Sequence, residues 1–191
     1  MSDTEHSKWY IERFRSMAAA GNDLDGEARL LDAMLPRDAR VLDAGCGPGR
    51  AAGYLHSRGH RVVGVDIDPL LIEAAAADYP GPTYVVADLA DLTLSMLGAD
   101  EPFDAALCAG NVMAFVAEDA EVAVLEGIRR CVKLDGFALV GFHVDRYPLA
   151  RFDSDADRAG WEVEQRFGTW DLRPFTAESD FAVTVLRNSH R

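Results

Sequence analysis

Cysteine is scarce in this sequence, and its spacing excludes two classes of protein. Cys46, Cys108 and Cys131 are the three cysteines, and they lie far apart. A disulfide framework needs several paired cysteines, and a zinc site needs closely spaced pairs. We therefore expect no structural metal, and the cytoplasm is the compartment that this cysteine usage indicates.

Basic residues are also few. The chain has 19 lysines and arginines against 32 aspartates and glutamates, which gives a formal net charge of −13. Nucleic acids and anionic membrane surfaces require a basic face on the protein that binds them. The charge therefore predicts neither partner. No inserted domain is long enough to recognise a macromolecule, so a small molecule is the expected partner, and we expect the chain to be a monomer or a homodimer.

Long apolar runs are missing as well. The first 20 residues are interrupted by Lys8, Arg13 and Arg15, so they do not resemble a signal peptide, and no window approaches the length of a membrane span. A hydrophobic content of 49% over 191 residues is nevertheless enough for a core. We expect one domain over residues 1–191, with N-terminal helices over 1–36 and a cofactor-binding core over 37–191.

Glycine is concentrated in one turn. Gly45, Gly47 and Gly49 alternate between the apolar segment 41–42 and a helical segment at 51–58. One interpretation is that a ligand lies so close to the backbone that a Cβ would collide with it, at a helix N-terminus that attracts electron-rich groups. The alternative is a tight connection that uses glycine for its geometry alone.

The remaining pattern alternates strands with helices. Strands are expected at 61–65, 83–87, 103–108 and 137–144, with helices at 70–78, 118–132 and 149–159 and a closing antiparallel strand pair at 161–170 and 180–188. Two helices, at 7–20 and up to Leu35, precede the first strand. Parallel strands linked by helices form a doubly wound sheet.

Each of the first three strands is followed by an aspartate. Asp43, Asp66 and Asp88 stand at these strand ends. Ligands of open α/β sheets bind outside the carboxyl ends of the strands, so we expect the three carboxylates to converge. One carboxylate can accept both hydroxyls of a ribose, and Asp66 has the position for this role.

The residues around the turn separate two kinds of nucleotide site. A dinucleotide fold requires a glycine at position 50, where this chain has Arg50, and Asp43 would repel a pyrophosphate but attract an amino group. The run Asp43-Ala-Gly45-Cys-Gly47-Pro-Gly49 instead resembles the first motif of class I S-adenosylmethionine-dependent methyltransferases. A nicotinamide-dependent oxidoreductase remains the alternative, as does a module that binds the cofactor without turnover.

The resemblance implies a Rossmann-like, seven-stranded, mostly parallel sheet with one antiparallel strand, helices on both faces and two leading helices. It also implies S-adenosylmethionine as cofactor and S-adenosylhomocysteine as product. Carried over by motif, the cofactor-binding residues are Asp43, Gly45, Cys46, Gly47, Gly49, Asp66, Ile67, Asp88, Leu89, Cys108 and Ala109. In similar methyltransferases Asp88 would bond the adenine amino group, and a leading helix often closes over the cofactor.

Methyl transfer from a sulfonium mainly needs alignment of the reacting atoms, and a general base only when the nucleophile must lose a proton early. His143 is the candidate base, although a histidine at a strand end is often structural, and Asn111 is a candidate to orient the substrate. Arg146 is expected to hold a carboxylate or phosphate of the substrate, with Tyr147 and Tyr10 nearby. The methyl acceptor is not defined by any motif.

Overall fold

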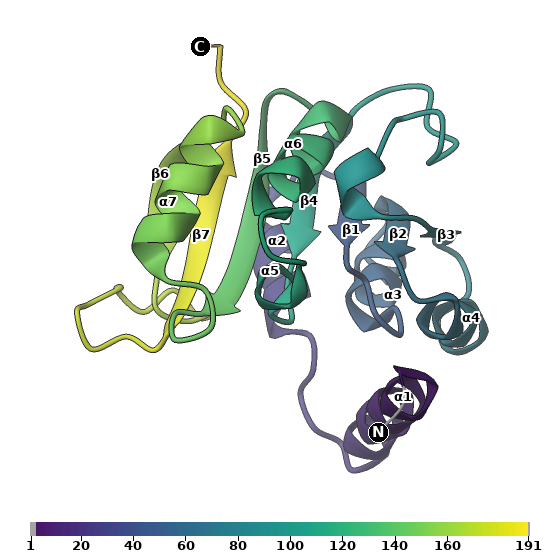
Figure 1. Cartoon of the computed structure of the whole chain (residues 1–191). Helices are drawn as coiled ribbons and strands as arrows, with labels where there is room; N and C mark the ends of the chain where they lie inside the picture. Colours follow the sequence, from purple (N-terminus) through teal and green to yellow (C-terminus); the bar gives the residue numbers. More distant parts are fainter. Residues whose placement is uncertain (1–2, 191) are drawn as a thin grey trace.

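The computed structural model describes residues 3–190, and its elements alternate much as the sequence predicts (Figure 1). In chain order they are α1 (Asp3–Ala19), α2 (Gly26–Met34), β1 (Arg40–Ala44), α3 (Arg50–Ser57), β2 (Arg61–Asp66), α4 (Pro69–Asp78), β3 (Thr83–Val86), the short 3-10 helix η1 (Leu89–Asp91), β4 (Phe103–Cys108), α5 (Val112–Phe115), α6 (Glu121–Cys131), β5 (Val132–His143), α7 (Leu149–Arg158), β6 (Glu162–Phe167) and β7 (Phe181–Arg187).

Seven strands of the described residues form one sheet, in the order β3-β2-β1-β4-β5-β7-β6. The pairs β1–β2, β2–β3, β1–β4 and β4–β5 are parallel. Only β7 runs in the opposite direction, since it pairs antiparallel with both β5 and β6. The doubly wound, mostly parallel sheet with one reversed strand is therefore confirmed.

The central strands are apolar on both faces because helices cover both. Along β1, Val41 joins the cluster formed with the buried residues of α2 and α3, and Leu42 joins the cluster formed with those of α6 and α7. Both side chains are fully buried. This continuous apolar pattern, without alternation, is typical of a parallel strand between two helical layers. Because β1 to β5 are parallel, their carboxyl ends lie at the same edge of the sheet, where α1 lies in Figure 1.

Two expectations, one for β6 and one for the segment between β4 and α6, need revision. The alternation over 161–170 predicts a single face for Val163, Gln165, Phe167 and Thr169, but the register of β6 shifts between Val163 and Gln165. Val163 is 40% exposed because β6 is an edge strand. The helix expected at 118–132 also begins later, at Glu121, and the additional short helix α5 follows Asn111, whose φ is +64°.

Candidate functional site

A cavity of about 1040 Å³ lies at the carboxyl ends of the strands. Its walls come from α1, the turn after β1, the ends of β2 and β3, the turn between β4 and α5, and the end of β5. Thirteen of the predicted site residues line it, as follows: Tyr10, Asp43, Gly45, Cys46, Gly47, Asp66, Ile67, Asp88, Leu89, Ala109, Asn111, His143 and Arg146.

Packing within the protein explains most of the glycines in the turn after β1. Gly45, Gly47 and Gly49 have φ values of +77°, +53° and +85°, which disfavour other residues. A Cβ on Gly45 would lie 2.3 Å from Val112, and one on Gly49 would lie 2.6 Å from Ala75. Collision with a ligand therefore does not explain these two glycines. Gly47 differs, because its nearest neighbour would be the Tyr10 ring at 3.5 Å.

Asp66 links the turn to the second strand. One of its oxygens accepts the backbone N–H of Gly47 at 2.9 Å, and the other accepts that of Asp68 at 3.0 Å. Burial raises the pKa of this carboxyl, while the two backbone donors lower it. Each oxygen keeps a lone pair, so the carboxylate can still accept a hydrogen bond from a ligand.

Asp43 is the most deeply buried acid of the cavity. It is only 3% exposed, and its Oδ2 has no hydrogen-bond partner within the described residues. Burial raises the pKa of Asp43 to about 7, although the guanidinium of Arg50 lowers it. An unpaired buried oxygen of this kind is rare in native structures and calls for a donor. A ligand ammonium group in the cavity would meet that need.

The third acid, Asp88, lies two residues beyond β3. Its Oδ1 caps η1 by accepting the N–H of Ala90 at 2.9 Å. The neighbouring Leu89 is 8% exposed and also lines the cavity, while Ile67, beyond β2, is 67% exposed. The three strand-end acids therefore share one cavity, as the sequence predicts, with apolar side chains beside the two outer ones.

The opposite part of the cavity is built by the ends of β4 and β5. Asn111 begins α5, and its side-chain oxygen accepts the backbone N–H of His143 at 2.7 Å. The His143 ring packs edge-on against Phe181, with ring centroids 4.9 Å apart. Arg146 follows on the turn after β5. Asn111 thus holds the two strand ends together, a structural role that its residue type alone did not reveal.

Three predicted site residues do not line the cavity. Gly49 packs against α4, and Cys108 is fully buried at the end of β4. Tyr147 is 3% exposed and its hydroxyl donates to Asp155 at 2.7 Å, so its side chain belongs to the core beside α7. Its place next to Arg146 in the sequence suggested a contact with substrate, but successive residues of this turn point in different directions.

Helix α1 contributes cavity residues that the sequence analysis overlooked. His6, Ser7, Arg13 and Phe14 line the cavity with Tyr10. Ser7, Tyr10 and Phe14 recur at spacings of three and four, so a helical projection would have grouped them. Ser7 donates to Asp68, and Arg15 forms two hydrogen bonds, of 2.8 and 3.1 Å, with Asp78. These contacts fix α1 beside α4.

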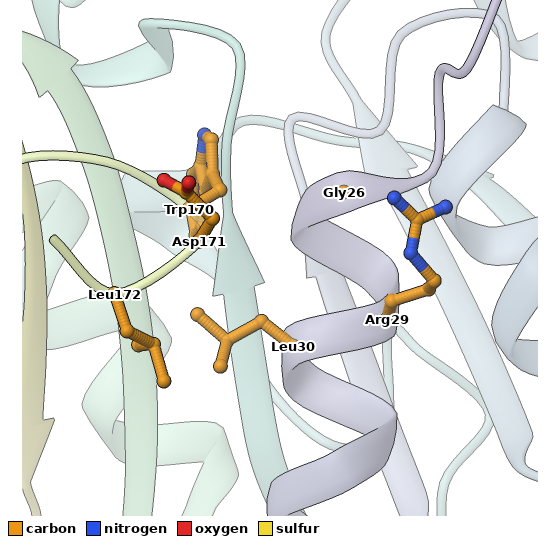
Figure 2. A pocket seen from close by; sticks show the side chains of 6 residues that line it. All are labelled: Gly26, Arg29, Leu30, Trp170, Asp171 and Leu172. Atoms are coloured by element: carbon orange, nitrogen blue, oxygen red, sulfur yellow. The ribbon is translucent and has the colours of Figure 1, made fainter.

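A second, smaller hollow of about 450 Å³ lies between α2 and the loop that follows β6 (Figure 2). Figure 2 shows Leu30 of α2 pointing toward Leu172 of the loop, with Trp170 and Asp171 behind. The charged residues here are already paired. Arg29 binds Asp23 at 2.6 and 2.7 Å, and Asp171 accepts hydrogen bonds from Thr169 and Arg173.

Residues 3–190 hold neither a metal-binding cluster nor a helix that could cross a membrane. No cluster of three or more histidines, cysteines, aspartates or glutamates there is arranged to hold a metal ion. No helix in the same residues has both the length and the apolar character needed to span a membrane.

Comparison with known proteins shows which proteins this chain resembles. Residues 41–136 match the model of a methyltransferase domain. A TehB-like SAM-dependent methyltransferase from Corynebacterium glutamicum is 46% identical, with a TM-score of 0.91 over 97% of this chain and 100% of that one. A 1,6-didemethyltoxoflavin-N1-methyltransferase from Burkholderia thailandensis, solved with S-adenosylhomocysteine, is 21% identical with a TM-score of 0.65 and shares the fold.

The curated relatives are also methyltransferases, although they are longer than this chain. The malonyl-[acyl-carrier protein] O-methyltransferase of Pseudescherichia vulneris is 39% identical over 167 residues, and the match covers 80% of this chain but 63% of that protein. An uncharacterised methyltransferase from Synechocystis is 29% identical and is covered over 61% of its length. Taken with the family model and the Corynebacterium structure, these matches show that the chain belongs to the class I S-adenosylmethionine-dependent methyltransferases.

Proposed function

We propose that the protein transfers a methyl group from S-adenosylmethionine to a small molecule bound in the cavity of about 1040 Å³. The observation that carries the proposal is the buried Asp43, which lines the cavity beside the glycine turn and whose Oδ2 has no hydrogen-bond partner among residues 3–190. The cofactor supplies an ammonium group for that oxygen and a sulfonium methyl group for the reaction. The nicotinamide alternative has no support from the related proteins.

The other acids are assigned by their order along the sheet. Asp66 would accept the ribose hydroxyls with the lone pairs left by its two backbone donors. Asp88, one strand further out, would accept the adenine amino group, with Leu89 and Ile67 against the ring. Cys46 and Ala109 line the cavity near the turn and would contact the methionine part.

Helix α1 would act as the cover that keeps water from the methyl group. Phe14 stacks on Arg50, with the guanidinium carbon 5.3 Å from the ring centre, and Tyr10 lies over Gly47. Burial raises the pKa of Tyr10, so its hydroxyl keeps its proton and can donate to substrate. His143 remains the candidate for a general base, and its ring would have to receive the proton of the acceptor atom.

Calorimetry tests the proposal directly. S-adenosylhomocysteine should bind with one site per chain, and NAD should not bind under the same conditions. Transfer of a tritiated methyl group from S-adenosylmethionine to mixtures of small acceptors then separates an enzyme from a module that only binds. Binding of NAD without binding of S-adenosylhomocysteine would refute the proposal.

A further inference from the structure

The charged residues of the cavity are segregated. Asp43, Asp66, Asp68 and Asp88 line the part formed by the first three strands. The part formed by residues 109–146 contributes no carboxylate to the described lining, although the chain carries a net charge of −13. Its charged or titratable members are His143 and Arg146. The cavity therefore has an acidic end and an end that is free of acids.

Contacts along the cavity walls show how the glycine turn is connected to the acid-free end. Val112 packs against Gly45, and Tyr10 extends from Gly47 toward Gly110, where its hydroxyl would lie 3.9 Å from a Cβ. The next residue, Asn111, bonds the backbone of His143. The N–H of Arg146 in turn donates to the carbonyl of His143 at 3.1 Å. The path from the glycine turn therefore leads past Gly110 and His143 to Arg146, away from the acids.

Arg146 is exposed and differs from the other arginines of residues 3–190, because its guanidinium forms no hydrogen bond, ion pair or ring contact with those residues. Arg50, in the same cavity, is bound to Glu27 and to the carbonyl of Leu24. Arg151 pairs with Glu121 at 2.8 Å, and Arg13 stacks on Trp9. A guanidinium presents a rigid fork of donors that matches a carboxylate. The guanidinium of Arg146 can therefore present this fork of donors to a ligand.

The acid-free end of the cavity also has apolar side chains. Val112, Phe115 and Val116 line the cavity, and Phe115 is 70% exposed. Apolar and aromatic side chains predominate in the lining of small-molecule sites, where they contact the hydrocarbon part of the ligand. The occupant of this end should therefore combine an anionic group with a hydrocarbon part.

Resting on the proposed methyl transfer, we propose that the methyl acceptor is a small organic carboxylate. Arg146 binds its carboxylate group, and Val112, Phe115 and Val116 contact its hydrocarbon part. One guanidinium balances the single charge of a carboxylate, whereas the two charges of a phosphate ester would leave one uncompensated in an acidic protein. The carboxylate-free lining also gives a cationic acceptor no partner at this end.

Three matched probes test this inference with the protein saturated by S-adenosylhomocysteine. They are 4-phenylbutyrate, its neutral amide and 4-phenylbutylamine, titrated by ligand-detected NMR. A charge-assisted contact should make the carboxylate bind about tenfold more tightly than the amide, and more tightly still than the amine. Arg146→Gln should remove this preference. Arg173→Gln, an exposed arginine paired with Asp171 at the smaller hollow, should retain it.

Several results would overturn the inference. These are equal binding of the three probes, tighter binding of the amine, an unchanged preference in Arg146→Gln, or no binding of the carboxylate in the millimolar range. The affinity for S-adenosylhomocysteine, measured on the same samples, separates this failure from that of the proposed function. Without cofactor binding both fail, and with cofactor binding only the carboxylate assignment fails.

Discussion

The cavity at the strand ends and the hollow beside α2 are each formed between a helix and turns of the sheet. They differ in whether their polar side chains are paired with other protein groups. In the hollow, Arg29 is held by Asp23, and Asp171 by Thr169 and Arg173. In the cavity, one oxygen of the buried Asp43 has no hydrogen-bond partner among the described residues, and the exposed guanidinium of Arg146 forms no hydrogen bond or ion pair with them.

This difference favours the cavity as the ligand site. Leaving the buried oxygen of Asp43 unpaired costs free energy, on the order of 1–3 kcal/mol, which a ligand donor in the cavity would offset. The guanidinium of Arg146 is exposed to water and carries no such cost, but its donors are open to a ligand. Paired surface charges need no ligand and contribute little to stability. Four predictions concern the cavity, and the first two each have a matched control outside it.

The largest effect is expected for Gly47→Val. Its side chain would enter the cavity between the turn and Tyr10, at a φ of +53°. Affinity for S-adenosylhomocysteine should fall by on the order of 100-fold or more, as measured by calorimetry. Gly98→Val is the matched control, because Gly98 has a φ of +61° and nothing within 4 Å of its Cβ position. It should lose stability from the same strain but bind the ligand normally, and equal losses of affinity in both variants would contradict the prediction.

Asp66→Ala should weaken the same binding by about 10- to 100-fold, because charge-assisted hydrogen bonds to the ribose contribute roughly 1.5–3 kcal/mol. Circular dichroism should show an intact fold. Asp171→Ala, at the smaller hollow, removes a carboxylate that is 67% exposed and should leave affinity unchanged. An Asp66 variant that binds as tightly as the Asp171 variant would remove Asp66 from the site.

Binding should also depend on pH through Asp43. Its pKa of about 7 in the folded protein lies above the unfolded value, so between about pH 4 and 7 the folded state holds a proton that the unfolded chain has released. The stability of the ligand-free protein should therefore fall as pH rises through this window. An ammonium ligand favours the carboxylate, so affinity should rise with pH up to about 7, by at most about tenfold per unit.

Asp43→Asn removes this titration. Thermal unfolding and calorimetry between pH 5 and 8 should show that the stability and the affinity for S-adenosylhomocysteine both depend less steeply on pH in the variant. The sulfonium ligand is unstable toward alkali, so S-adenosylhomocysteine is the probe of choice. A variant whose affinity keeps the pH dependence of the original protein would show that another group binds the ammonium.

The smallest effect is expected for Asp88→Asn. Asp88 would accept the adenine amino group and repel a 6-oxo base, whereas asparagine can rotate its amide to donate. The preference for S-adenosylhomocysteine over S-inosylhomocysteine should shrink several-fold, within the value of one hydrogen bond. The cap that Asp88 provides to η1 is retained in the variant, since an asparagine oxygen can also accept the N–H of Ala90. Identical discrimination in both proteins would exclude contact with the base.

Much of the site followed from local pattern. An apolar strand with an acid at its end, then glycines, then a helix can be identified in the sequence because each feature depends on neighbouring residues. The helix start at Asp68 and Pro69 is an example, since Asp68 accepts the N–H of Leu70 at 2.8 Å and Pro69 stands at the first helical position. The roles of Asn111 and Tyr147 were not predictable in this way, because they depend on contacts with His143 and Asp155.

The sequence by itself determined the order of strands and helices, the glycine turn and the three strand-end acids, since backbone preference and hydrophobic period act over a few residues. Only the tertiary structure decided that Gly45 and Gly49 face Val112 and Ala75 and that α1 lines the cavity. It also decided that Arg146 has no partner among the described residues. Each of these depends on segments far apart in the chain, whose packing is set by the whole sheet and not by any one segment.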